Sequence, residues 1–194
     1  MPESQAETTR LAEIRAIALD VDGVLTDGGF WWGADGEELK RFSFIDVMGL
    51  SLARRAGFVL ALVSGEDSTL VDRYAEKMLI RHVVKGCRDK AGALRRLSSE
   101  TGVGLEEFCY MGDDINDIPA MQIAGVSFAP ASAHALVLSC AQIVTRNPGG
   151  HGAVREMIDA LLAARGVDPR ETLGKKEIAG INAKTVCTDA HETL

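Results

Sequence analysis

Two aspartates near the start of the chain are the first residues whose types and spacing could do chemistry. Asp20 and Asp22 follow an apolar run at residues 14–19, and Gly23 comes next. Because one residue separates them and a glycine opens the loop, both carboxylates can be aimed into one site at the end of a buried strand. Paired acids suit nucleophilic attack and proton transfer. A solvated turn rich in Asp and Gly is the alternative interpretation.

Two further segments carry residues that could bind an anion. Ser64 and Gly65 follow the apolar run 58–63, where a hydroxyl and a free amide suit phosphate; an ordinary helix cap would use the same residues. Lys90 begins a predicted helix, where a cation opposes the helix dipole. A nearby anion is one reason for that lysine, and plain solvation is the other interpretation.

An acidic cluster follows the apolar run 108–111. Its sequence is Gly112-Asp113-Asp114-Ile115-Asn116-Asp117. Three carboxylates within five positions repel one another unless a cation or a proton relieves them. A hard divalent cation with oxygen ligands is the simplest relief, so the cluster predicts a metal site.

The elements between these motifs predict how the motifs meet. Apolar runs at 14–19, 58–63, 108–111 and 126–128 alternate with stretches of helical spacing at 47–56, 69–78, 90–99, 133–138 and 153–164. Strands that alternate with helices of this size predict an α/β fold, a Rossmann-like parallel sheet with helices on both faces. The carboxyl ends of such strands share one edge, where the motifs would gather.

Residues 28–44 interrupt this alternation. They read GGFWWGADGEELKRFSF, with two aromatic-containing arms around a turn rich in Gly and Asp, and predict a projecting β-hairpin. We expect one domain at residues 11–166, flanked by flexible tails at 1–10 and 167–194.

Composition excludes several classes of function. The chain has 194 residues, of which 46% are apolar and 25% charged, and a formal net charge of −7. An acidic chain without a basic block argues against binding to nucleic acid or to anionic membranes. The four cysteines have no C-x-x-C spacing, and neither a signal peptide nor a run of ~20 apolar residues is present, so we expect a cytoplasmic protein.

The order of the motifs resembles that of the haloacid dehalogenase superfamily of phosphohydrolases. The resemblance covers about residues 14–165 and rests on Asp20-Val-Asp22, Ser64, Lys90 and the acidic cluster. It implies that Asp20 attacks phosphorus to form an aspartyl phosphate. It also implies that Asp22 protonates the leaving alkoxide and then activates water.

The same resemblance implies the binding residues for phosphate. Ser64 and the amide of Gly65 would hold the phosphoryl oxygens. Lys90 would offset negative charge on the nucleophile and the phosphate in the transition state.

It further implies a Mg²⁺ cofactor. The ligands would be Asp20, Asp113 and the backbone carbonyl of Asp22. Asp114 and Asp117 would support the site, either through a metal-bound water or by positioning the lysine, and the sequence leaves this choice open.

The motif spacing leaves no room for the cap domain that members of the superfamily usually insert. The 44 residues from Asp20 to Ser64 are used by the hairpin and one helix. A bare site would be open to water, so we expect subunits to cap one another. At least one of Trp31 and Trp32 should face outward in a monomer, since adjacent strand residues face opposite ways. This predicts a homo-oligomer, and the subfamily resemblance described next implies a homotetramer.

Residues 20–28 and 149–156 resemble the corresponding motifs of a capless subfamily, the 3-deoxy-D-manno-octulosonate 8-phosphate phosphatases. They also resemble related phosphatases that act on nine-carbon, sialic-acid-type 9-phosphates. The predicted substrate is thus a small phosphorylated sugar acid. The octulosonate enzymes usually have Thr-Gly-Arg where this chain has Ser64-Gly65-Glu66. Glu66, with Lys77 eleven residues on, favours the nine-carbon substrate slightly, and Arg155 is a candidate for the substrate carboxylate. Helix-start and salt-bridge roles for Glu66 and Arg155 are the alternatives.

Two other functions remain as alternatives. A receiver-type signalling domain also combines acids, a hydroxyl and a lysine on a parallel sheet, but in another order. A non-catalytic assembly domain, related to domains fused to sugar-nucleotide synthetases, would not need to retain the five residues of the motif set: Asp20, Asp22, Ser64, Lys90 and Asp113.

Overall fold

The sheet confirms the predicted α/β architecture. The computed structural model describes residues 5–173. Six strands pair in parallel in the order β5-β4-β1-β6-β7-β8. Their bounds are β1 Ala16–Leu19, β4 Val59–Val63, β5 His82–Val84, β6 Phe108–Met111, β7 Val126–Ala129 and β8 Ile143–Val144.

Strand β1 lies in the middle of the sheet and is buried along its whole length. Leu19, its last residue, is paired with Leu62 of β4 and with Met111 of β6. The chain passes from β1 to β4 on one side and later returns to β6 on the other. Asp20 therefore lies at the topological switch point, where the strand order reverses, which is the usual place for a ligand in such folds.

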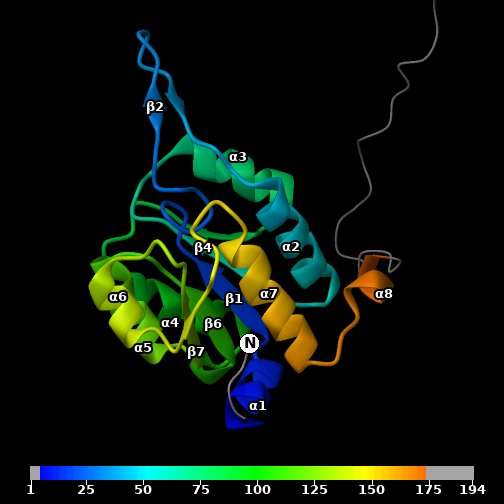
Figure 1. Cartoon of the computed structure of the whole chain (residues 1–194). Coiled ribbons are helices and arrows are strands. Elements are labelled where there is room, and N and C mark those ends of the chain that lie inside the picture. Colours follow the sequence, from blue (N-terminus) through cyan, green and yellow to red (C-terminus); the bar gives the residue numbers. More distant parts are fainter. Residues whose placement is uncertain (1–4, 174–194) are drawn as a thin grey trace, which may run out of the picture.

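Helices cover both faces of the sheet (Figure 1). One core holds Ile17 and Leu19 of β1 and includes residues of α1, α2, α3 and α7, and the other holds Ala16 and Ala18 with residues of α4, α5 and α6. The helix bounds are α1 Gln5–Glu13, α2 Phe44–Arg55, α3 Thr69–Met78, α4 Lys90–Thr101, α5 Ile118–Ile123, α6 Ala135–Cys140, α7 Ala153–Ala164 and α8 Pro169–Leu173.

The predicted hairpin is present and stands out from the domain between β1 and α2 (Figure 1). Its paired strands are short, β2 Trp31–Trp32 and β3 Glu38–Leu39. The predicted arm extended to Phe44, which instead begins α2. The reason is Ser43, whose Oγ accepts a hydrogen bond from the Ile45 amide at 3.2 Å and caps the helix.

Parts of both predicted tails form helices. Helix α1 begins at Gln5, inside the tail expected at residues 1–10, and ends at Glu13, and its residue Leu11 is fully buried. Helix α8 lies within the tail expected at 167–194, where Thr172 is buried. Residues 174–194 lie outside the described part of the chain.

Within residues 5–173, only the hairpin is inserted between β1 and α2, and no cap domain is present. The same residues contain no helix with the length and apolar character that a membrane crossing requires.

Candidate active site

A buried lysine lies at the centre of the carboxyl edge of the sheet. Lys90 Nζ lies 3.0 Å from Asp20 Oδ1 and 2.7 Å from Asp117 Oδ1, and its side chain is 1% exposed. Burial by itself would lower the pKa of Lys90, but the charges of the two carboxylates outweigh it and raise that pKa above its ordinary value. Lys90 is thus a fixed positive charge directly beside Asp20, as the resemblance implied.

Asp117 positions that lysine. Besides Lys90, its Oδ1 accepts a 2.7 Å hydrogen bond from the Tyr110 hydroxyl, while Oδ2 accepts 3.2 Å bonds from the amides of Asp113 and Asp114. Asp114 is exposed, and its Oδ1 accepts from the Ile115 amide at 2.7 Å. The geometry favours a lysine-positioning role for Asp117 and a capping role for Asp114.

Three carboxylates form a group that could hold a metal ion. One oxygen each from Asp20, Asp113 and Asp117 lie within 4.8 Å of one another. Asp113 Oδ1 is buried and has no hydrogen-bond partner, which is costly unless a cation or a water satisfies it. The donor set consists of hard oxygens, as Mg²⁺ prefers, so the residues present fit that ion.

Proton affinity in this group is correspondingly high. Burial, and then the charge of Asp117, raise the pKa of Asp113 to about 6. Burial and the same neighbour also raise the pKa of Asp20 well above its ordinary value, although Lys90 opposes this. A divalent cation bound here would replace these protons and reduce the repulsion among the carboxylates.

Gly23 lets the loop after Asp22 approach this group. Its φ is +86°, and a Cβ at this position would overlap the Asp113 carboxylate. The loop is also held by Gly149 and Gly150, where a Cβ would overlap backbone of residues 23–27. The two segments that carried the subfamily resemblance are therefore in contact, although more than 100 residues separate them.

Ser64 lies at the end of β4 and is buried, while Gly65 is exposed. The Ser64 Oγ accepts a 3.1 Å hydrogen bond from the Glu66 amide, which leaves the hydroxyl proton for another partner. Helix α3 is capped by Ser68, whose Oγ accepts from the Leu70 amide at 3.2 Å, so the helix-cap alternative for Ser64 is wrong. The geometry is compatible with a role of Ser64 in phosphate binding.

A second lysine, Lys40, was not predicted from the sequence. Its Nζ lies 2.8 Å from Asp22 Oδ1 and 2.6 Å from Glu66 Oε2, and its side chain is only 2% exposed. Burial opposes its charge, but hydrogen bonds with both carboxylates raise its pKa above the ordinary value. Its partners are 18 and 26 positions away, so local spacing gave no signal for this contact.

Two of the candidate substrate residues lie apart from this group. Lys77 Nζ lies over the ring of Phe44, 5.1 Å from the centroid. Arg155 Nε donates to Asp159 at 2.8 and 2.9 Å, which is the salt-bridge alternative considered for it. Neither side chain is paired with the Asp20 group in the described contacts.

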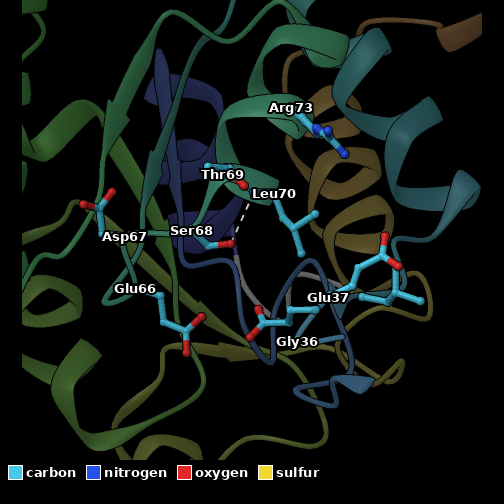
Figure 2. A pocket seen from close by; sticks show the side chains of 10 residues that line it. Gly36, Glu37, Glu66, Asp67, Ser68, Thr69, Leu70 and Arg73 are labelled. Atoms are coloured by element: carbon cyan, nitrogen blue, oxygen red, sulfur yellow. Dashed lines mark hydrogen bonds between the residues drawn. The ribbon is translucent and has the colours of Figure 1, made fainter. Parts of the chain in front are cut away.

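A cavity of about 760 Å³ adjoins Glu66 (Figure 2). It lies between the hairpin and the start of α3, and Arg73 is the one cation among its lining residues. Those residues are Gly36, Glu37, Glu38, Leu39, Glu66, Asp67, Ser68, Thr69, Leu70 and Arg73.

Known proteins share both the sequence and the fold. A family profile described as haloacid dehalogenase-like hydrolase matches residues 64–158. The 3-deoxy-D-manno-octulosonate 8-phosphate phosphatase KdsC of Escherichia coli is 39% identical over 165 residues, which cover 85% of this chain and 88% of the relative. The chain belongs to the haloacid dehalogenase-like hydrolases.

Solved structures of such hydrolases superpose on it. The octulosonate 8-phosphate phosphatase of Yersinia pestis gives a TM-score of 0.81 at 36% identity, covering 88% of this chain and 90% of the other. The enzyme of Moraxella catarrhalis, solved with magnesium, phosphate and the sugar acid, gives a TM-score of 0.81 at 33% identity, covering 84% of this chain and 94% of the other. This haloacid dehalogenase-like hydrolase is therefore a phosphoric monoester hydrolase, and the receiver alternative is not supported.

Proposed function

We propose that this hydrolase releases phosphate from 3-deoxy-D-manno-octulosonate 8-phosphate, with Mg²⁺ as its cofactor. The relatives reported above are named for that substrate, and one of them was solved with magnesium. The observation that carries the proposal is the group of buried Asp20, half-buried Asp113 and buried Asp117 around Lys90, in which Asp113 Oδ1 is buried and lacks a partner.

The residues that would perform the reaction lie on one edge of the sheet. Asp20 attacks phosphorus, and the bond from phosphorus to the sugar oxygen breaks. Asp22 gives its proton to that oxygen, which is otherwise a poor leaving group. In the second half, Asp22 takes a proton from water as the water attacks the aspartyl phosphate, which frees Asp20 and inorganic phosphate.

Charge on the phosphoryl group is offset by the chain and by the cation. Lys90 holds a positive charge 3.0 Å from the Asp20 carboxylate, while Ser64 and Gly65 offer a hydroxyl and an amide to phosphoryl oxygens. Mg²⁺, held by Asp20, Asp113 and the carbonyl of Asp22, would supply charge stabilisation and orientation. The acidic group could not take up a phosphate dianion without such positive charge.

The sugar portion would occupy the cavity beside Glu66 (Figure 2). Its hydroxyl side chains, and its acidic side chains other than Glu66, suit the hydroxyl groups of a sugar, and Arg73 suits the carboxylate. The preference for a nine-carbon substrate rested on Glu66, whose carboxylate is already paired with Lys40. This pairing weakens the case for the longer acid.

The test is a comparison of phosphate release from octulosonate 8-phosphate and from nine-carbon keto-acid 9-phosphates. We expect a kcat/KM for the eight-carbon ester at least about tenfold higher, a difference of about 1.4 kcal/mol. A preference for the nine-carbon esters would refute the assignment of substrate while leaving the phosphatase chemistry in place. Release from neither class would refute the proposed function.

We further propose that the hairpin builds a homotetramer in which a neighbouring subunit covers each site. Trp31 and Trp32 are 56% and 71% exposed, and Phe44, Ile45 and Met48 form further exposed apolar surface at the start of α2. Burial of one such side chain contributes about 1.5–3 kcal/mol, so these residues favour self-association. Lys77, which lies over Phe44, would then be near a neighbour's site.

Replacing both tryptophans by serine tests this assembly. We expect the variant to dissociate in light scattering and to show a raised KM for the sugar phosphate but not for a small aryl phosphate. A wild-type monomer with normal activity at micromolar concentration would contradict the proposal.

A further inference from the structure

Lys40 links the hairpin to the proposed general acid. It follows β3 in the return arm, and its ammonium group lies between Asp22 Oδ1 at 2.8 Å and Glu66 Oε2 at 2.6 Å, with Glu38 Oε1 at 3.6 Å. Its side chain is almost fully buried, whereas Asp22 and Glu66 are 32% and 56% exposed. The lysine is thus buried, although the two carboxylates that it contacts are accessible to solvent.

The backbone that carries Lys40 is held by its neighbours. Arg41 Nη2 donates to the Gly150 carbonyl at 2.9 Å, which lies beside the loop after Asp22. Phe42 stacks on Tyr74 of α3, with ring centroids 4.2 Å apart. Three successive side chains therefore fasten the arm to three parts of the domain, which fixes where the ammonium group can reach.

The pairing leaves one oxygen of Asp22 for chemistry. Lys40 contacts Oδ1 at 2.8 Å, which leaves Oδ2 as the oxygen to face a leaving group. A carboxyl group that transfers a proton must hold one oxygen within hydrogen-bond reach of the leaving group. An ammonium fixed on the other oxygen restricts rotation of the side chain toward that arrangement.

We propose that Lys40 is a positioning residue that orients Asp22 for proton transfer, and that Glu66 acts through Lys40 rather than by touching the substrate. The inference rests on the proposed function, since it needs Asp22 to protonate the leaving oxygen. Glu66 holds the ammonium from the side opposite Asp22. Without it, the lysine would have one strong partner fewer and a wider range of positions.

Lys40→Met tests the inference, because methionine keeps the length of the side chain and loses its charge. An alkyl leaving group needs its proton, whereas p-nitrophenolate leaves without one. The readout is kcat/KM, which reports the steps up to departure of the leaving group and not the later attack of water, in which Asp22 is the base for both esters. We expect kcat/KM for octulosonate 8-phosphate to fall on the order of 10–100-fold, as misplacement of a catalytic group does. For p-nitrophenyl phosphate we expect kcat/KM to fall less than about threefold.

The chain offers a matched control. Lys85 Nζ also bridges two carboxylates, Asp67 at 2.9 Å and Asp72 at 2.6 Å, and has no contact with Asp22. The Lys85→Met variant should turn over both substrates at close to the wild-type rate. Lys40→Arg, which keeps the charge, should recover part of the alkyl-ester activity that Lys40→Met loses.

Glu66→Gln separates action through Lys40 from direct contact. In the wild-type background, we expect Glu66→Gln to lower kcat for the alkyl ester by less than Lys40→Met does. In the Lys40→Met background we expect no further fall, because both substitutions disturb the position of the same ammonium group. An increase in KM for the sugar phosphate in both backgrounds would show that Glu66 contacts the substrate and would overturn that part of the inference.

Failure of the inference is distinguishable from failure of the proposed function. Wild-type protein that releases no phosphate from either ester would overturn the function and the inference with it. Active wild-type protein combined with equal losses of kcat/KM for alkyl and aryl esters in Lys40→Met, or with no loss for either, would overturn the inference alone.

Discussion

Two lysines, each between two carboxylates, lie at the same edge of the sheet and differ in how the fold holds them. Lys90 is the first residue of α4, and its partners Asp20 and Asp117 are themselves buried. Lys40 is carried on the hairpin, and its partners Asp22 and Glu66 are accessible to solvent. The first group is built from the elements of the domain, and the second is brought together by an insertion.

The difference suggests a division of tasks. The buried group concentrates charge where phosphoryl transfer would occur, at the cost of carboxylates whose pKa values are raised. The accessible group lies where a leaving group and water would arrive and depart. Lys90 should therefore matter for both stability and chemistry, and Lys40 mainly for chemistry.

The largest expected effect comes from the buried group. Asp20→Asn should abolish turnover of alkyl and aryl esters alike, because an amide is nearly isosteric but cannot attack phosphorus. Phosphate release and circular dichroism check this together. A folded Asp20→Asn protein with turnover near wild type would remove Asp20 from the nucleophile role.

The second prediction compares the two lysines directly in their stability. Lys90→Met leaves two buried carboxylates without a counter-charge, so we expect a loss of about 3–5 kcal/mol in the free energy of unfolding. Lys40→Met disturbs pairs whose acidic partners are solvated, so we expect a loss of no more than ~1 kcal/mol. Urea denaturation measures both, and equal losses would contradict the division described above.

The smallest effect concerns the pH dependence of cation binding. Because burial raises the pKa of Asp113 to about 6 in the metal-free chain, a cation must displace a proton below that pH. The Mg²⁺ concentration for half-maximal activity should rise as the pH falls below about 6, by up to about tenfold per unit. Asp113→Ala should raise that concentration and flatten its dependence on pH.

Much of the buried group could be predicted because its residues follow apolar strands. The runs before Asp20, Ser64 and Asp113 became β1, β4 and β6, and residues 69–78 and 153–164 are helical as expected. Parallel pairing then places the motif residues at one edge without further information. The order of the motifs was enough to indicate the family.

The remainder depends on contacts that no local pattern contains. Lys40 lies in a charged stretch of the hairpin, and only its return against the loop after β1 brings it to Asp22. The choice between Asp114 and Asp117 likewise required the position of Lys90. Short elements such as β5, β8 and α5 were missed because they have too few residues to show a period.

The central claim is that Asp20 accepts the phosphoryl group and Asp22 manages the proton. It is tested most directly by trapping the intermediate in the Asp22→Asn variant with p-nitrophenyl phosphate. This ester transfers its phosphoryl group without acid assistance. The aspartyl phosphate that forms should then accumulate, because the variant has no base to activate water. After acid quenching, mass spectrometry should find one phosphoryl group on the peptide that contains Asp20, and none in an Asp20→Asn/Asp22→Asn double variant. Steady phosphate release with no phosphoryl group on Asp20, or with the label on another residue, would contradict the account.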